Sequence, residues 1–208
     1  MARLHNNYTL LSALKMGVWL IRTKLIWPKA RLFRFPLALF GKKYIDFGER
    51  LTLGRNCRLE AYSLDGTFYK RLIFGKDVQL NDNVHIDAME LVRIGNNVLI
   101  ASHVFISDNS HGGYSEDSSC NPDIPPMERD YVIKPVSIGD NVWIGEGVFI
   151  TMGVNIGKGS VIGAHSFVNT DIPDYSIAVG TPAKIVKKYN FDIQKWCKVN
   201  KEGEFINR

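Results

Sequence analysis

The sequence predicts an all-β solenoid, a parallel β-helix flanked by an N-terminal helical arm and a short C-terminal helix. Three observations predict this fold. Large apolar residues recur at every sixth position, Gly or Asn often follows them, and the interruptions of the period collect at one corner. An α-helix, with 3.6 residues per turn, would scatter a six-residue period around its axis, whereas short strands joined by tight corners keep it in line.

The repeat has fifteen apolar positions, which form five coils of three. They are Phe47, Leu53, Leu59, Phe74, Leu80, Ile86, Ile94, Ile100, Ile106, Ile138, Ile144, Ile150, Ile156, Ile162 and Val168. Gly and Asn after these residues supply the backbone angles of a corner. Stacked coils pair as parallel strands about 4.8 Å apart and bury the apolar column. We therefore expect a β-helix over residues 45–188.

Three insertions interrupt the repeat, at 65–73, near Val92 and at 112–137. All three fall at the same corner of the predicted coil, and insertions on one edge of a solenoid usually mark its binding face. The longest, 112–137, is rich in Pro, Ser and Asp. A long loop in a compact domain is usually functional or disordered, and we expect this one to cover and select a substrate.

The segment before the repeat, residues 1–44, is predicted to be a basic and apolar helical arm. Residues 1–43 contain nine Lys or Arg and no Asp or Glu, and Leu10, Leu14, Val18, Ile21 and Leu25 recur at helical spacing. The run is too charged for a membrane span and lacks a signal-peptide cleavage site. Two interpretations remain open. The helix packs on the body or on a neighbouring subunit, or residues 8–43 make a peripheral contact with an anionic membrane surface.

Other features limit the class of protein. Three cysteines without a CxxC pair indicate neither a disulfide framework nor a structural zinc site, and favour a cytoplasmic setting. His103 and His165 share a corner column but lie two coils apart, about 10 Å, too far to share a metal ion. We therefore expect no metal. Residues 189–208 should form a short helix and a tail.

These hexads resemble those of the hexapeptide-repeat acyltransferase family. The run IGDNVWIGEGVFITMGVNIGKGSVIGAHSFVNTDIPDYSIAVGTPAKIVKKY is similar to the C-terminal half of galactoside and maltose acetyltransferases. The basic apolar N-terminal segment and the motif ISDNSHG resemble O-acetyltransferases of lipopolysaccharide O-antigen and capsule biosynthesis. The resemblance implies a left-handed β-helix, a homotrimer with active sites between subunits, acetyl-CoA as donor, a sugar acceptor and no nucleic-acid partner.

His111 is the predicted catalytic base. It lies eleven residues beyond the end of IGNNVLI, as the catalytic histidine does in galactoside-type enzymes, and it directly precedes the long loop. Attack of a sugar hydroxyl on a thioester needs a base, and imidazole exchanges protons near neutral pH. The alternative is a solvent-exposed corner histidine. Asp108 and Glu128 are candidates to orient the ring.

The resemblance also implies acceptor and donor residues. Asn83 aligns with an acceptor-binding asparagine, although Asn is a favoured corner residue in any case, and Asp108 is placed with it in the acceptor site. The remaining residues belong to the predicted CoA site: Trp143, Gly145, Ala164, Lys184 and Lys187. Lys provides a point charge for the CoA phosphates in place of the bidentate pairing of Arg.

The sequence thus predicts an acetyl-CoA-dependent O-acetyltransferase that acts on a bacterial surface polysaccharide (O-antigen, capsule or exopolysaccharide) or its precursor. It would work in the cytoplasm, or on the inner face of the membrane if the arm binds there. One alternative is acetylation of a small soluble acceptor, such as a free sugar, serine or an antibiotic. A second is a non-catalytic β-helix scaffold, which would bind no CoA.

Overall fold

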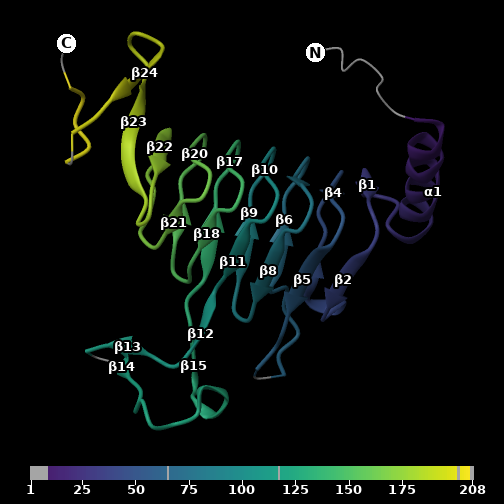
Figure 1. Ribbon diagram of the computed structural model, residues 1–208, viewed down its shortest axis with the longest axis horizontal. Helices are drawn as coiled ribbons and strands as arrows, with labels where there is room; N and C mark the ends of the chain where they lie inside the picture. Colours follow the sequence, from purple (N-terminus) through teal and green to yellow (C-terminus); the bar gives the residue numbers. More distant parts are fainter. Residues whose placement is uncertain (1–8, 65, 117, 201, 207–208) are drawn as a thin grey trace.

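The computed structural model describes residues 9–64, 66–116, 118–200 and 202–206. A helix lies at one end, a stack of strands follows, and an antiparallel pair of strands lies at the other end (Figure 1). Helix α1 spans Leu10–Ile26, and the Thr9 side chain caps it by accepting a hydrogen bond from the Ser12 N–H. Within the described ranges, no helix is long and apolar enough to cross a membrane.

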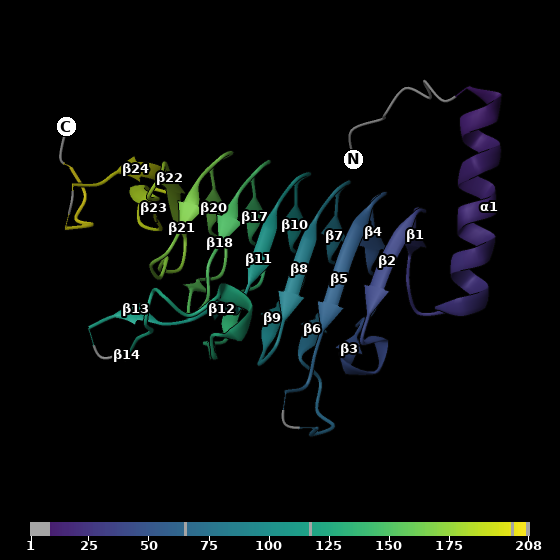
Figure 2. The same cartoon turned by 60° about the horizontal axis from the view of Figure 1, so that its bottom comes forward.

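Three sheets of parallel strands form the stack, and each sheet receives its strands in turn. Sheet 1 contains β1 (Leu32–Phe33), β4 (Thr52–Leu53), β7 (Gln79–Leu80), β10 (Leu99–Ile100), β17 (Trp143–Ile144), β20 (Val161–Ile162) and β22 (Ser176–Val179). Sheet 2 contains β2 (Leu37–Phe40), β5 (Cys57–Ala61), β8 (His85–Ala88), β11 (Phe105–Ser107), β18 (Phe149–Ile150) and β21 (Phe167–Val168). Sheet 3 contains β3 (Ile45–Asp46), β6 (Leu72–Phe74), β9 (Val92–Ile94), β16 (Val136–Ile138) and β19 (Asn155–Ile156). One strand from each sheet makes a coil, and Figure 2 shows the coils stacked along the long axis.

The predicted apolar column is the core. Of the fifteen positions, all except Phe47 are at most 2% exposed. Equivalent residues meet in register, as Leu80, Ile100 and Ile144 do on sheet 1. Phe47 is only partly buried because it lies in the end layer, where its ring packs 6.0 Å from that of Trp27 and 5.8 Å from that of Phe33. The six-residue period and its phase are confirmed.

The corner between sheets 1 and 2 explains why polar residues recur there. Asn56, Asn83, His103, Gly147 and His165 all have positive φ, between 55° and 65°, and occupy this corner in successive coils. Backbone hydrogen bonds join the coils at this point, for example from the His165 N–H to the Glu146 carbonyl, at 2.7 Å. Asn and His tolerate the left-handed region better than most residues. The corner role predicted for His103 and His165 is therefore confirmed.

The insertions lie at the corner between sheets 2 and 3, as predicted. The chain crosses it between β5 and β6, between β8 and β9, and between β11 and β16. The last crossing holds the long loop, which contains β12 (Asn109–His111), β13 (Tyr114–Ser115), β14 (Ser118–Ser119), the 3-10 turn η2 (Pro126–Glu128) and β15 (Tyr131–Ile133). The loop projects from the side of the stack (Figure 2).

The N-terminal boundary differs from the prediction. The helix ends at Ile26. Strands β1 and β2 lie within residues that were expected to belong to the helical arm, and together with β3 they complete a first coil. Phe33 and Leu39 obey the six-residue spacing and pair in register with Leu53 and Leu59. The next core position in phase, Phe47, is eight residues after Leu39. Two extra residues, spanned by the 3-10 turn η1 (Lys42–Tyr44), hide this coil from a search for a strict period.

The predicted C-terminal helix is wrong. Residues 184–198 form β23 (Lys184–Asn190) and β24 (Lys195–Lys198), which extend sheet 1 by antiparallel pairing with β22. Tyr189 and Trp196 lie opposite each other, with ring centroids 5.4 Å apart. Cross-strand aromatic pairs of this kind stabilise antiparallel strands, so the apolar residues here serve a hairpin and not a helix face.

Candidate active site

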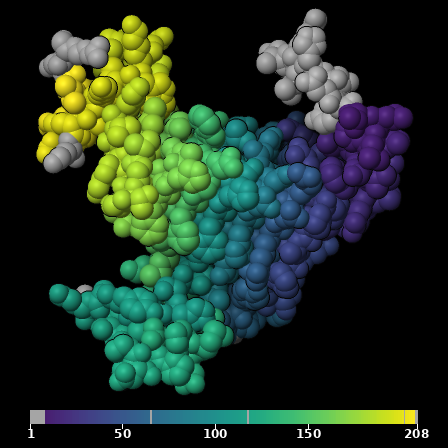
Figure 3. All heavy atoms as spheres, viewed as in Figure 1, coloured from purple at the N-terminus to yellow at the C-terminus, as the bar shows by residue number. Residues whose placement is uncertain are grey.

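His111 ends strand β12 at the base of the projecting loop. Its partner in β15 is Tyr131, and the two ring centroids are 4.5 Å apart. The backbone on either side is fixed, because the His111 carbonyl accepts a 2.6 Å hydrogen bond from the Tyr114 hydroxyl and the Gly112 N–H donates to the Asp130 carbonyl at 2.9 Å. Figure 3 shows a recess between this loop, in teal, and the last coils, in yellow-green. His111 thus belongs to the short antiparallel strand pair β12–β15 and not to a turn.

The ring of His111 is half-buried and its Nδ1 atom is buried. Within the described part of the chain, Nδ1 has no hydrogen-bond partner. Glu128 lies exposed in η2 and has no hydrogen bond or ion pair with His111. Neither predicted carboxylate orients the imidazole within this chain, because the Asp108 carboxylate binds backbone N–H groups instead.

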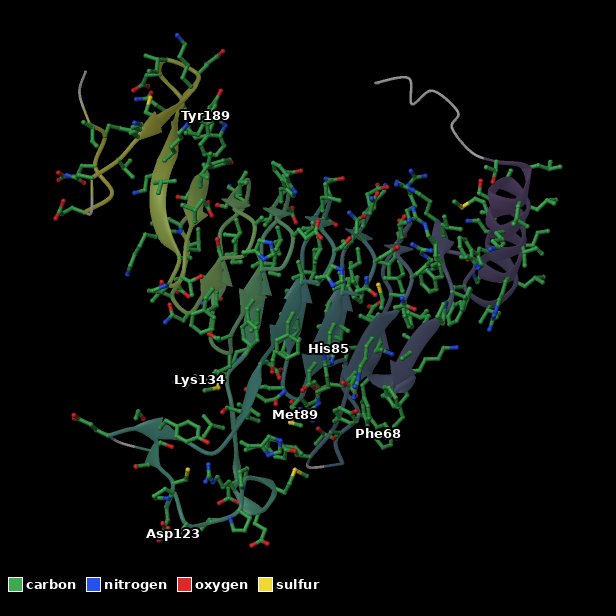
Figure 4. All side chains as sticks on the ribbon, viewed as in Figure 1. Phe68, His85, Met89, Asp123, Lys134 and Tyr189 are labelled. Atoms are coloured by element: carbon green, nitrogen blue, oxygen red, sulfur yellow. The ribbon has the colours of Figure 1, made fainter. Side chains whose placement is uncertain are left out.

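Asp108 is fully buried and holds backbone in place. Its carboxylate accepts hydrogen bonds of 2.8 Å from the N–H groups of Met89, Glu90 and Leu91. Its own carbonyl accepts a 2.8 Å hydrogen bond from the Lys134 N–H, which closes the base of the loop. Met89 and Lys134 both lie near this base in Figure 4. Asp108 therefore holds residues 89–91, between β8 and β9, against the base of the long loop. This role differs from the predicted contact with the acceptor.

Asn83 and His111 lie at opposite ends of the strands of sheet 2. Asn83 precedes β8 and His111 follows β11, and these two strands are parallel neighbours. The side chain of Asn83 lies in the corner column, where its Oδ1 accepts from Asn56 at 3.1 Å and its Nδ2 lies 3.3 Å from Nε2 of His103. One chain alone does not bring the predicted acceptor asparagine to the predicted base.

A polar cluster on the outer face of sheet 2 was not predicted. Glu60 is 4% exposed and contacts Arg58 at 2.6 Å, the Tyr62 hydroxyl at 2.5 Å and Nε2 of His85 at 2.7 Å. Burial raises the pKa of Glu60, but hydrogen bonds from these three groups outweigh it and lower the pKa to about 2. Burial and the bond to Glu60 raise the pKa of Tyr62 to about 12. The alternation of outward residues in CRLEAY and VHIDA is the signal that places these side chains on one face.

The same face continues toward the strand of His111. Asp87, two residues after His85, accepts a 3.1 Å hydrogen bond from Asn109 Nδ2 in β12. Burial raises the pKa of Asp87, and the negative charges of Glu60 and Asp108 add to this effect. His85 itself lies on the outer side of the sheet (Figure 4) and its ring is 4.9 Å from that of Phe105. Carboxylates and an imidazole thus line the approach to β12.

The predicted donor residues gather on one side of the last coils. Trp143 is 52% exposed on β17, and its row on sheet 1 continues in register through Val161 and Ile177 to Lys187 on β23. Lys184 is exposed at the start of the same strand. At about 4.8 Å per strand, three spacings separate Trp143 from Lys187 by roughly 14 Å.

Gly145 and Ala164 lie in neighbouring coils of this region. A Cβ on Gly145 would lie 2.6 Å from the Ala164 backbone nitrogen, so the adjacent coil itself requires glycine here. This packing requirement is a different reason for the glycine from the predicted approach of a ligand. Ala164 is exposed beside it.

The described residues contain no group of three His, Cys, Asp or Glu arranged to hold a metal ion. The three cysteines are free, and burial raises the pKa of the Cys57 thiol to about 11, so this thiol is a poor nucleophile at neutral pH.

Comparisons with known proteins agree with this architecture. Residues 135–169 match the family model described as "Hexapeptide repeat of succinyl-transferase". Over 197 residues the chain is 39% identical to an Escherichia coli K12 protein named "Putative lipopolysaccharide biosynthesis O-acetyl transferase WbbJ". The match covers 94% of this chain and 98% of that protein. It is 34% identical to galactoside O-acetyltransferase of the same strain over 139 residues, 67% of this chain and 64% of that one.

Two solved structures are similar. Galactoside acetyltransferase in complex with coenzyme A has a TM-score of 0.52 and 33% identity, and the match covers 68% of this chain and 66% of that one. AntD, an N-acyltransferase from Bacillus cereus, has a TM-score of 0.64 at 22% identity, with 79% and 84% covered. The second likeness concerns the fold alone.

Proposed function

Because the chain belongs to the hexapeptide-repeat acyltransferase family, we propose that it transfers an acetyl group from acetyl-CoA to a sugar hydroxyl. The acceptor is a bacterial surface polysaccharide, such as O-antigen, capsule or exopolysaccharide, or its precursor. The observation that carries this proposal is the 39% identity, over 94% of this chain, to the E. coli protein named "Putative lipopolysaccharide biosynthesis O-acetyl transferase WbbJ". Three free cysteines favour the reducing cytoplasm as the place of reaction.

His111 is the general base of this reaction. A ring nitrogen takes the proton of the acceptor hydroxyl while the hydroxyl oxygen attacks the carbonyl carbon of the thioester. The tetrahedral intermediate then collapses, the carbon–sulfur bond breaks, and the leaving sulfur takes the proton from the imidazolium. Direct transfer of this kind needs no acyl-enzyme. The half-buried place of His111 at the base of the loop, in the strand pair β12–β15, supports this role.

The donor binds along the outer face of the last coils. Pantetheine would run past Trp143 and beside Gly145 and Ala164, and the ammonium groups of Lys184 and Lys187 would attract the CoA phosphates. The row from the exposed Trp143 to the half-buried Lys187 supports this path, since its length of roughly 14 Å suits an extended ligand. The coils wind left-handed in this proposal, as the family resemblance implies.

The complete site requires a homotrimer. Asn83 cannot reach the His111 of its own chain, because one lies before and the other after the parallel strands β8 and β11. The buried Nδ1 of His111 lacks a partner among the described residues, and buried polar atoms are normally paired. Both observations support a site in which the neighbouring subunit supplies Asn83 and a group that orients the imidazole.

An acceptor panel tests the proposal. The purified chain is incubated with acetyl-CoA and with surface glycans, free sugars, serine or an antibiotic, and the products are analysed by mass spectrometry. We expect acetylated glycan. Acetylation of the small acceptors alone would contradict the proposed acceptor class. Failure of CoA to raise the melting temperature would instead favour a non-catalytic scaffold, because a ligand that binds only the folded state must stabilise it.

A further inference from the structure

Helix α1 contacts the stack through one narrow face. Thr23 is fully buried, and its hydroxyl oxygen accepts a 2.8 Å hydrogen bond from the Phe33 N–H and donates to the Trp19 carbonyl at 2.6 Å. Just beyond the helix, the ring of Trp27 packs 4.9 Å from that of Phe33. Met16 and Trp19 lie half-buried on the same face. The helix is thereby fixed across the first coil.

The opposite face of α1 is apolar and exposed. It consists of Leu10, Leu14, Val18, Ile21 and Leu25, which we call the outer stripe, and these side chains are 80%, 60%, 63%, 64% and 80% exposed. Their spacing of three or four residues places them in one line along the helix. A contiguous apolar stripe of this kind on a protein surface usually marks an interaction site. The stripe faces away from the stack, because it lies opposite the buried Thr23.

Basic residues flank the outer stripe on both sides. At about 100° per residue, Lys15 and Arg22 lie on one flank and Lys24 on the other, each roughly 80–100° from the centre of the stripe. The side chains of Lys15 and Arg22 are exposed. Residues 1–43 contain nine Lys or Arg and no Asp or Glu. Asp77 and Asp82 of the stack pair with Arg31 and Arg34 of this segment, which leaves the charges of α1 without a carboxylate partner among the described residues.

We propose that the outer stripe binds the surface of an anionic lipid bilayer, with α1 lying in the plane of the headgroups. Apolar side chains on one face and cations beside them are the features that hold a helix at such an interface. The same charges disfavour pairing of two copies through this stripe, because the cationic flanks of both helices would meet without a carboxylate of the arm between them.

The orientation of the stack follows from this contact. Helix α1 lies across the β1 end of the coils (Figure 2), so the coils would extend away from the bilayer. His111 leaves the fourth coil. Three coil spacings of about 4.8 Å and a helix diameter of about 10 Å place it roughly 25 Å above the headgroups. If the proposed function holds, a lipid-linked acceptor must project about that far to reach the base. Binding of the bilayer itself does not depend on the proposed function.

Sedimentation with vesicles tests the proposal without an activity assay. The full chain is mixed with vesicles of phosphatidylcholine alone or with about 30 mol % phosphatidylglycerol, at about 0.1 M and about 0.5 M salt. We expect binding to the anionic vesicles that weakens in the higher salt. Ile21→Glu should reduce the partition coefficient at least about tenfold, because it removes an inserted aliphatic group and adds a like charge.

Ile193→Glu is the matched control. Ile193 is 55% exposed, close to the 64% of Ile21, but lies in the C-terminal hairpin at the other end of the stack. This variant should bind vesicles as the unchanged chain does. Absence of binding to anionic vesicles, or equal loss in both variants, would overturn the proposal. A fall in the mass of the lipid-free particle caused by Ile21→Glu, measured by light scattering, would also overturn it, because the stripe would then be a contact between chains.

Discussion

Between Ile138 and Val168 every sixth side chain is apolar and buried, and each lies in register with its equivalent in the next coil. Between 108 and 135 the chain is held differently. There Arg129 donates to the carbonyls of Ile124 and Pro122 at 2.8 and 3.0 Å, and the Tyr114 hydroxyl donates to that of His111. Apolar burial builds the coils, whereas polar side chains shape the loop. The comparison shows that apolar side chains in register hold the repeat, whereas hydrogen bonds between polar groups hold the interruption.

Asp108 joins the two regions, and its loss should have the largest effect on stability. Asp108→Ala leaves one buried and two partly buried N–H groups without an acceptor, so we expect a loss of about 3–5 kcal/mol in the free energy of unfolding. Urea denaturation measures it. Asp123→Ala, in the exposed part of the same loop, should change stability by less than about 0.5 kcal/mol. Equal effects would show that Asp108 does not brace the corner.

Glu60 makes the frame sensitive to acid. Its pKa falls from 4.5 to about 2 on folding, so its contribution is present above pH 4.5 and is lost as the pH falls toward 2. That contribution is at most about 3 kcal/mol, and less if solvent screens the exposed Arg58. Denaturation at several pH values should show this loss, and Glu60→Gln should remove most of it. An unchanged pH profile in the variant would contradict the role given to the cluster.

Two glycines should respond to alanine in opposite ways. Gly145→Ala places a Cβ 2.6 Å from the Ala164 backbone and should cost about 1–3 kcal/mol. Gly17 lies in the middle of α1, and apart from its neighbours in the helix backbone no described atom lies within 4 Å of the added Cβ. Gly17→Ala should therefore stabilise the chain by up to about 1 kcal/mol. Thermal unfolding of both variants checks the signs. Stabilisation by Gly145→Ala would show that the neighbouring coil does not need glycine there.

The repeat was predictable because each hexad carries its own signal, so fourteen of fifteen positions are deeply buried and the insertions share one corner. The first coil was hidden because two extra residues before Phe47 break the phase. The C-terminal helix was wrong because Tyr189 and Trp196 pair across strands, a contact that spacing alone does not reveal. The cluster around Glu60 needed the register between β5 and β8, which pairs residues 27 positions apart and so brings His85 to Glu60. His111 stays a prediction that rests on its fixed distance from a motif, and its Nδ1 has no hydrogen-bond partner in the described part of the chain.

The central claim is that chemistry resides at the interruption, on His111, and not in the histidines of the corners. It is tested most directly by the kcat of His111→Ala beside that of His103→Asn, a corner variant whose new residue already occurs in the same column as Asn83. We expect His111→Ala to lower kcat at least about a hundredfold while CoA binding and the melting temperature are retained, and His103→Asn to keep kcat within about twofold. Retention of more than about a hundredth of kcat by His111→Ala would contradict the claim.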